Sequence, residues 1–436
     1  MRENILSRLK KKTTSKVFRN QWLYVLVIII EFLGIHFSSD LATELGNWSV
    51  KAGQILHGHI PTDNFYGPGS SIMLIPFLWN GPTYFLANIF YLSLGAIFYF
   101  KICRNIRHHW MEFIALAALP LNVYLLWLCN SSQDTVFEFF LCTLMLWSLL
   151  KLRWGLFAIS GLLLSEARSG YWVPFIGISA IYALRGFRKQ HKINWRWSLA
   201  FPLLIVVTGL NTFFYSSPSP ALEAGMTFHL SYNKYYYLSH PKFDMDVFLS
   251  GKNGIFSKDF VGDMPSTASQ AEANSYLVRT AIREAAANPK ETILGWMQKY
   301  DSQIFDVQKI PHLPGSYVLD PATKTIAIGN ERLSWVLVLG NLAYMFYRSI
   351  LVVTGLLGLG IFLQLRRSNK NFLERSMKLK ILAYPWIFGL IPAILVYSET
   401  RFKVVSELLL VPLIAEIWSI YILQSKPGDS SESSSK

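Results

Sequence analysis

The stretch Pro82–Phe100 has the sequence PTYFLANIFYLSLGAIFYF, nineteen residues without a charged side chain. A helix needs about 20 such residues to cross the hydrocarbon core of a bilayer. Six other runs approach the same length and apolar character: Trp22–Phe37, Met111–Cys129, Ser198–Tyr215, Tyr347–Leu365, Ile381–Tyr397 and Val404–Leu423. No water-soluble core needs so many apolar helices, so the sequence predicts a polytopic membrane protein.

Composition and charge distribution agree with this prediction. Hydrophobic residues make up 52% of the chain and charged residues only 16%. The formal net charge of +14 does not point to nucleic acid, because the basic residues lie in short segments between the apolar runs: Arg2–Arg19, Lys101–His109, Lys151–Arg153, Arg185–Arg196 and Arg366–Lys380. The positive-inside rule places these segments in the cytoplasm. We therefore expect a multi-pass protein of the inner (plasma) membrane with both termini cytoplasmic and no nucleic-acid partner.

Counting crossings from a cytoplasmic N-terminus gives about ten helices. The predicted fold class is an all-α polytopic membrane protein with a small extracytoplasmic domain. The expected spans lie near 22–37, 82–100, 111–129, 135–150, 154–165, 171–184, 198–215, 340–365, 381–398 and 403–424. Segment 154–184 is short for two full crossings and has Glu166, Arg168 and Gly170 at its middle, so a hairpin of tilted or broken helices is an alternative there.

These spans divide the chain into parts with different expected locations. They are a basic cytoplasmic N-terminus (1–21), a transmembrane bundle (22–215) that includes a first outward loop (38–81), a soluble outward domain (216–332), C-terminal transmembrane helices (333–424) and a Ser-rich, disordered cytoplasmic tail (425–436). Neither outward segment is a simple connector, because both exceed the usual length of a loop. Residues Ser269–Ala287 of the outward domain show the spacing of an amphipathic helix.

Ionisable residues collect at the outward ends of the predicted helices. They are Asp40, Glu44, Asp134, Glu138, Glu166, Arg168, Glu399 and Arg401. Charge at a membrane boundary is costly without a partner or a function. Neighbouring carboxylates can bind a divalent cation or act as a general base. An Arg beside them can hold a phosphate through paired hydrogen bonds. Glu31, Glu407 and Glu416 lie inside spans and need partners within the bundle.

The order of these residues resembles the GT-C superfamily of multi-spanning glycosyltransferases, especially the branch of protein O-mannosyltransferases and the aminoarabinose transferase of lipid A. The segment Asp40–Gly58, DLATELGNWSVKAGQILHG, is similar to that family's progression of acidic residue, aromatic residue, Ala and Gly. Asn64–Gly69, NFYGPG, is similar to its aromatic and proline segment that re-enters the membrane, and Glu399–Phe402, ETRF, resembles its Glu-x-Arg-Tyr element. The resemblance covers roughly 20–215 and 340–424 and is weak over the outward domain.

The resemblance implies an inverting sugar transfer from a polyprenyl-phosphate-linked donor to an extracytoplasmic glycan, lipid or protein acceptor. The family has an Asp four residues before the loop aromatic, where this chain has Glu44, so Asp40 and Glu44 both remain candidates for the catalytic carboxylate. The other implied roles are donor-phosphate binding by Arg401, Arg168 and Glu399, binding of a divalent metal (Mg or Mn) or of the acceptor by Asp134, and a substrate loop with Tyr66 and Trp48.

Structural interpretations of the same residues remain open. Asp134 fits the N-cap of the helix that starts at 135. Glu166 and Arg168 could form an ion pair that hides charge in a short hairpin. A transporter or flippase of a lipid-linked or small polar substrate is the main alternative function, and a scaffold that presents 216–332 is another. A transporter would place ionisable residues near the bilayer midplane, whereas here they lie at outward helix ends.

Overall fold

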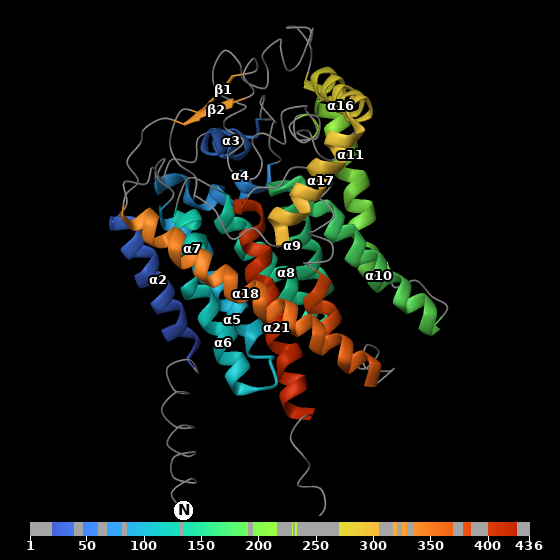
Figure 1. Ribbon diagram of the computed structural model, residues 1–436. Coiled ribbons are helices and arrows are strands. Elements are labelled where there is room, and N and C mark those ends of the chain that lie inside the picture. The colour runs from blue at the N-terminus through green and yellow to red at the C-terminus, as the bar shows by residue number, and fades with distance from the viewer. Residues whose placement is uncertain are drawn as a thin grey trace, which may run out of the picture.

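The computed structural model describes residues 20–38, 47–59, 68–80, 85–130, 134–190, 195–215, 229, 232, 270–304, 317–320, 325–328, 335–368, 378–384 and 400–424. Apart from turns and short connections, these residues are helical except for one antiparallel hairpin of β1 (Tyr317–Asp320) and β2 (Thr325–Ile328), in which Tyr317 pairs with Ile328. Figure 1 shows long helices lying side by side in a bundle, with shorter elements gathered at one of its ends. The helical class predicted from the sequence is confirmed at this level.

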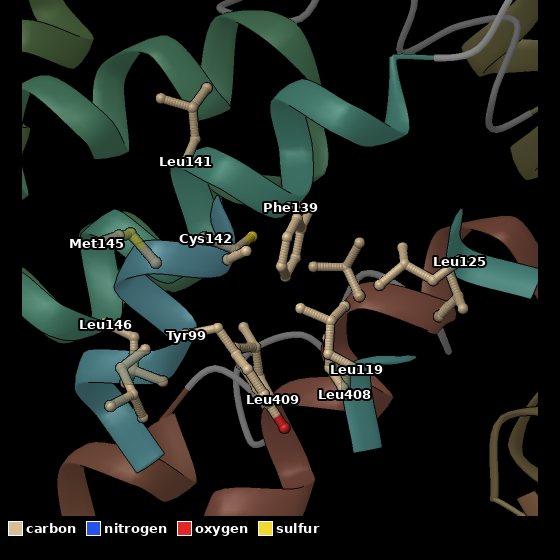
Figure 2. Close-up of a cluster of buried hydrophobic side chains, with 14 of the residues drawn as sticks. Tyr99, Leu119, Leu125, Phe139, Leu141, Cys142, Met145, Leu146, Leu408 and Leu409 are labelled. Carbon is tan, nitrogen blue, oxygen red and sulfur yellow. The ribbon is translucent and has the colours of Figure 1, made fainter. Parts of the chain in front are cut away.

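The bundle is built from ten helices of the described chain. They are α2 (Gln21–Ser38), α5 (Phe85–Cys103), α6 (His109–Leu121), α7 (Val123–Asn130), α8 (Thr135–Leu150), α9 (Trp154–Ala167), α10 (Trp172–Gln190), α11 (Ala200–Tyr215), α18 (Trp335–Ser368) and α21 (Thr400–Gln424). Helix α8 is central and packs against α5, α7, α9 and α21. Figure 2 shows the core that results, in which Phe139 and Cys142 of α8 lie near Tyr99 of α5 and Leu408 of α21.

Several of these helices could span a membrane. By length and apolar composition, four segments of the described chain qualify: Phe85–Cys103, Trp195–Phe214, Leu342–Arg367 and Val404–Gln424. Helices α6 and α7 qualify together as a fifth, bent span. The shorter apolar helices are Gln21–Phe37, Gly69–Trp79, Thr135–Leu150, Trp154–Ala167 and Ser169–Leu184. Helices therefore occupy most of the predicted spans, while only 378–384 of the span predicted at 381–398 is described.

The span predicted at 111–129 is broken. Helices α6 and α7 meet at an angle of 44° around Asn122. Pro120 contributes to the break because it has no N–H for the helical ladder. The Asn122 side-chain oxygen accepts a hydrogen bond from the Leu125 N–H at 3.0 Å, which caps the new helix. The single apolar run at 111–129 therefore forms two helices.

The two ends of the bundle differ in character. At one end α7 and α9 finish and α8 begins, and α3 (Asn47–Leu56), α4 (Gly69–Leu74) and the 3-10 turn η1 (Ile75–Asn80) pack together there. Figure 1 shows the hairpin, α16 (Gln270–Ala287) and α17 (Pro289–Ile304) at this same end. We call it the site end. Helix α16 confirms the amphipathic helix predicted at 269–287.

At the opposite end, which we call the basic end, α5, α8 and α21 finish and α6 and α9 begin. Basic side chains lie over aromatic rings there. The Lys101 ammonium is 5.4 Å from the centroid of the Trp147 ring, and the Arg153 guanidinium is 5.2 Å from the same ring. Trp beside Lys and Arg is typical of the boundary between lipid and water, so these contacts fit a bundle that ends at a membrane surface here.

Candidate functional site

A buried charged cluster at the site end is centred on Arg168. Its Nε lies 2.9 Å from Asp134 Oδ2, its Nη2 lies 2.5 Å from Asp134 Oδ1, and its Nη1 lies 2.6 Å from Glu138 Oε2. The Tyr171 hydroxyl donates a hydrogen bond to the other oxygen of Glu138. One guanidinium therefore holds two carboxylates, one of them through two parallel bonds, which is the strongest geometry for such a pair.

These charges are withdrawn from solvent. The Arg168 and Asp134 side chains are each 11% exposed and that of Glu138 is 1% exposed. Removing charged groups from water is costly unless the partners are close and well aligned. Asp134 and Glu138 already surround the positive charge of Arg168. The cluster therefore suits hydrogen-bond donors or cations better than a second anion.

Local structure explains how the cluster forms. Asp134 and Glu138 are four residues apart at the start of α8, so their side chains lie on one face of that helix. Arg168 ends α9: its N–H donates to the Leu164 carbonyl at 2.8 Å, and its own backbone is extended. The turn Ser169–Tyr171 (η2) then returns the chain to α10 and brings Tyr171 back towards Glu138.

Asp134 occupies the N-cap position of α8, as its sequence position predicts. Its carbonyl oxygen accepts from the N–H groups of Phe137 and Glu138 at 3.0 and 3.1 Å. Its carboxylate, however, makes no capping hydrogen bond. Arg168 binds the carboxylate instead. The capping interpretation therefore applies to the backbone of Asp134, and the functional interpretation to its side chain.

Helix α4 closes against the end of α9 next to Arg168. A Cβ on Gly69 would lie 2.5 Å from the Leu163 carbonyl oxygen and 2.7 Å from the Glu166 carbonyl carbon, so the two backbones are in direct contact. The Tyr91 hydroxyl of α5 donates to the Met73 carbonyl at 2.7 Å and holds α4 from the other side. Because α3 packs on α4, α3 is connected to the cluster through the contact of α4 with α9.

The end of α2 is fixed near the start of the cluster as well. His36 Nδ1 lies 2.8 Å from the Asn130 side-chain oxygen, and the Asn130 amide donates to the Phe32 carbonyl at 3.1 Å. Asn130 is fully buried at the end of α7, four residues before Asp134. His36 in turn stands four residues before Asp40.

The residues named from the sequence therefore divide into three groups. Asp134 and Arg168 are brought together directly. Trp48 and Arg401 lie in α3 and in the first turn of α21, where only the backbone is described. Those that lie outside the described residues are Asp40, Glu44, Tyr66 and Glu399. The roles expected for these last two groups remain predictions.

Glu138 and Tyr171 belong to the cluster although no role was predicted for them. The signal available for Glu138 was its spacing of four residues from Asp134 within an apolar segment. Tyr171 gave no such signal, because a Tyr near a membrane boundary is common. Arg168 has two partners in α8, Asp134 and Glu138, and its pairing with Glu166 remains a prediction.

A second buried cluster joins α18 to α21. Arg348 Nη1 lies 2.5 Å from Glu407 Oε1, and the Tyr344 hydroxyl donates to Glu407 Oε2 at 2.8 Å. Arg348 is only 1% exposed. Glu407 thus has the bundle partner that its position required. Glu416, near the basic end of α21, has partners in Arg107 and Lys378.

The site does not form a metal centre from the described residues alone. No group of three or more His, Cys, Asp or Glu in that part of the chain could hold an ion. The two carboxylates of the cluster, Asp134 and Glu138, both bind Arg168. A cation at Asp134 would need ligands beyond those described.

Comparison with known proteins gives no relatives: no family model, no curated protein and no solved structure matches this chain.

Proposed function

We propose that this protein is a membrane glycosyltransferase that moves a sugar from a polyprenyl-phosphate-linked donor to an extracytoplasmic glycan, lipid or protein. The observation that carries the proposal is the buried Arg168 with its two carboxylates at the site end. Buried charge of this kind within a membrane protein is costly and is typical of a functional site. The resemblance of the flanking loops to GT-C enzymes supplies the reaction class.

The proposal includes a topology of about ten crossings, with the site end outside the inner membrane and both termini in the cytoplasm. The four candidate spans, the bent pair α6–α7 and the shorter apolar helices other than Gly69–Trp79 supply nine segments for this count, and the predicted span at 381–398 is the tenth. The basic residues paired with Trp rings at the basic end support the orientation, because Lys and Arg favour cytoplasmic loops.

The catalytic base in this proposal is Asp40 or Glu44. Both belong to a loop whose ends are fixed, by α2 at Ser38 and by α3 at Asn47. Asp40 stands two residues beyond Ser38, so the chain can carry it at most about 7 Å from the end of α2. The base takes the proton of an acceptor hydroxyl, the oxygen attacks the anomeric carbon, and polyprenyl phosphate leaves. Such a base contributes about 10²–10⁴-fold.

Arg168 acts in this proposal through the carboxylates that it holds. Its contacts fix both oxygens of Asp134 and one of Glu138, which orients them to accept hydrogen bonds from sugar or acceptor hydroxyls. The carboxylates that surround Arg168 oppose a phosphate at the same place. Of the two Arg residues considered for the donor phosphate, Arg401 is therefore the better candidate.

Sugar transfer by the purified protein tests the proposal. A panel of polyprenyl-phosphate sugars is offered in detergent to the wild type, Asp40→Asn, Glu44→Gln and, as a matched control, Glu112→Gln, which removes a carboxylate at the basic end. We expect one of the two loop variants to lose at least about 100-fold in rate and the control to retain activity. Absence of transfer from every donor by the folded wild type would refute the proposal.

Transport is the second candidate, because two observations favour it. The break between α6 and α7 and the intramembrane pair Arg348–Glu407 are both features of transporters. Glu407 stands three residues into the span Val404–Gln424, however, which places it about 5 Å along the helix axis and far from the midplane. Movement of a lipid-linked sugar across vesicles containing the purified protein would favour transport over transfer.

A further inference from the structure

Three separate segments meet at the buried carboxylate of Glu416 near the basic end. Arg107, in the connection from α5 to α6, places its Nε 3.2 Å from Oε1 and donates its backbone N–H to Oε2 at 3.1 Å. Lys378 places its Nζ 3.3 Å from the same Oε1. Leu365, Leu379, Ile417 and Ile420 pack beside this contact and hold α18, segment 378–384 and α21 together. The position of both cations is therefore fixed by the fold.

The cluster has more positive charge than its carboxylate can balance. Two cations and one carboxylate leave a net charge of +1. The Glu416 side chain is fully buried, whereas those of Arg107 and Lys378 are 50% and 22% exposed, so the excess charge faces outward. A guanidinium has five N–H donors, and Arg107 directs its Nε at Glu416, which leaves donors for a ligand on the exposed side. Burial also lowers the pKa of the Lys378 ammonium below its ordinary value, although Glu416 acts in the opposite direction.

The surroundings place this excess charge at the depth of lipid headgroups. Trp110 follows Arg107 by three residues and is 42% exposed. Trp147 and Trp195 carry basic side chains over their rings at the same end of the bundle, with the Arg196 guanidinium 5.9 Å from the Trp195 centroid. Exposed Trp and basic residues mark the boundary between acyl chains and water.

We propose that Arg107 and Lys378 form a binding site for the phosphate of an anionic phospholipid in the leaflet at the basic end. A basic site between membrane helices is the usual way in which a protein recognises such a headgroup. The bound phosphate balances the excess charge, and Glu416 sets the spacing of the two cations. The inference depends on membrane insertion and is independent of the sugar-transfer activity.

Lipid binding to the purified full chain tests this site. Phosphatidylglycerol, phosphatidylcholine or inorganic phosphate is titrated into detergent micelles, and bound lipid is counted by native mass spectrometry alongside the shift in Tm. The variants are Arg107→Gln, Glu416→Gln and the control Lys151→Gln, which removes an exposed charge at the same end. Wild-type protein should bind phosphatidylglycerol in preference to phosphatidylcholine.

The variants should move affinity in opposite directions. One basic residue near an anionic surface corresponds to about a five-fold change in affinity. Arg107→Gln should therefore weaken phosphatidylglycerol binding about five-fold, and Glu416→Gln should strengthen it although it lowers the Tm of the lipid-free protein. Lys151→Gln should have no effect. Arg107→Lys, which keeps the charge, provides the comparison if Glu416→Gln does not fold. Unchanged affinity in Arg107→Gln, weaker binding in Glu416→Gln, or equal stabilisation by inorganic phosphate would overturn the proposal.

Discussion

Burial separates the ion pairs of this protein into two kinds. Arg104 and Glu112 approach to 2.5 Å, the same distance as Arg168 and Asp134, but the Arg104 side chain is 44% exposed and that of Arg168 only 11%. Water screens the first pair and stabilises either partner alone. The second pair has little access to water, so each member depends on the other.

Replacing Arg168 by Gln should therefore destabilise the protein much more than replacing Arg104 by Gln. The first change leaves Asp134 and Glu138 buried without their cation and should cost about 3–5 kcal/mol, whereas the second should cost about 0–1 kcal/mol. Thermal or denaturant unfolding in detergent measures both. Equal losses would mean that the Arg168 cluster is hydrated and contributes no more than a surface pair.

The sequence indicates which residues are unusual but not how they pair. Asp134 and Arg168 stand out because charge interrupts apolar segments. Their contact depends on α8 and α9 packing antiparallel, and on Arg168 ending α9 in an extended conformation. Arg348 escaped notice because its partner Glu407 is 59 residues away on another helix.

Among the elements, the contact of α4 with α9 constrains the site most directly. Two backbones approach at Gly69, and backbone atoms cannot move aside as a flexible side chain can. Gly53, on the neighbouring helix α3, has open space around its Cβ position. The two glycines therefore offer a matched comparison within one region.

Gly69→Ala should destabilise the protein by about 1–3 kcal/mol, because overpacking forces the two backbones apart. Gly53→Ala should stabilise it by about 0.5–1 kcal/mol, because Ala loses less conformational entropy than Gly in a helix. Unfolding midpoints of the two variants provide the measurement. A neutral Gly69→Ala would show that α4 can separate from α9 and does not position Arg168.

Helix boundaries could be predicted where polar residues replace apolar ones, but not where a helix bends within an apolar run. The start of α8 after Asp134 and the end of α11 at Tyr215 agree with the sequence because polar residues flank apolar ones there. The bend at Asn122 lies inside an apolar run, so hydrophobicity gave no sign of it. The hairpin of β1 and β2 was likewise not expected, since two four-residue strands are too short for a clear alternation.

At the scale of the whole molecule, the two ends should lie on opposite sides of the membrane. The native cysteines Cys103, Cys129 and Cys142 are buried, so they give little background for labelling. Arg283→Cys on α16 places an exposed thiol at the site end, and Lys151→Cys places one at the basic end. A membrane-impermeant maleimide should label position 283 in intact cells and position 151 only after permeabilisation. If position 151 were labelled in intact cells and position 283 only after permeabilisation, the protein would have the opposite orientation in the membrane.

The short length of α9 has a consequence for the lipid around it. Its fourteen residues rise about 21 Å, whereas an ordinary hydrocarbon core is about 30 Å thick. Ile159 on this helix is 58% exposed, so part of α9 faces outward from the bundle. Such hydrophobic mismatch is relieved by thinning of the bilayer, at a cost of fractions of a kcal/mol per Å. Local thinning of the bilayer beside α9 would bring the water interface closer to Arg168. A water-soluble molecule and a lipid-linked molecule could then meet there, the first still in water and the second still in the bilayer.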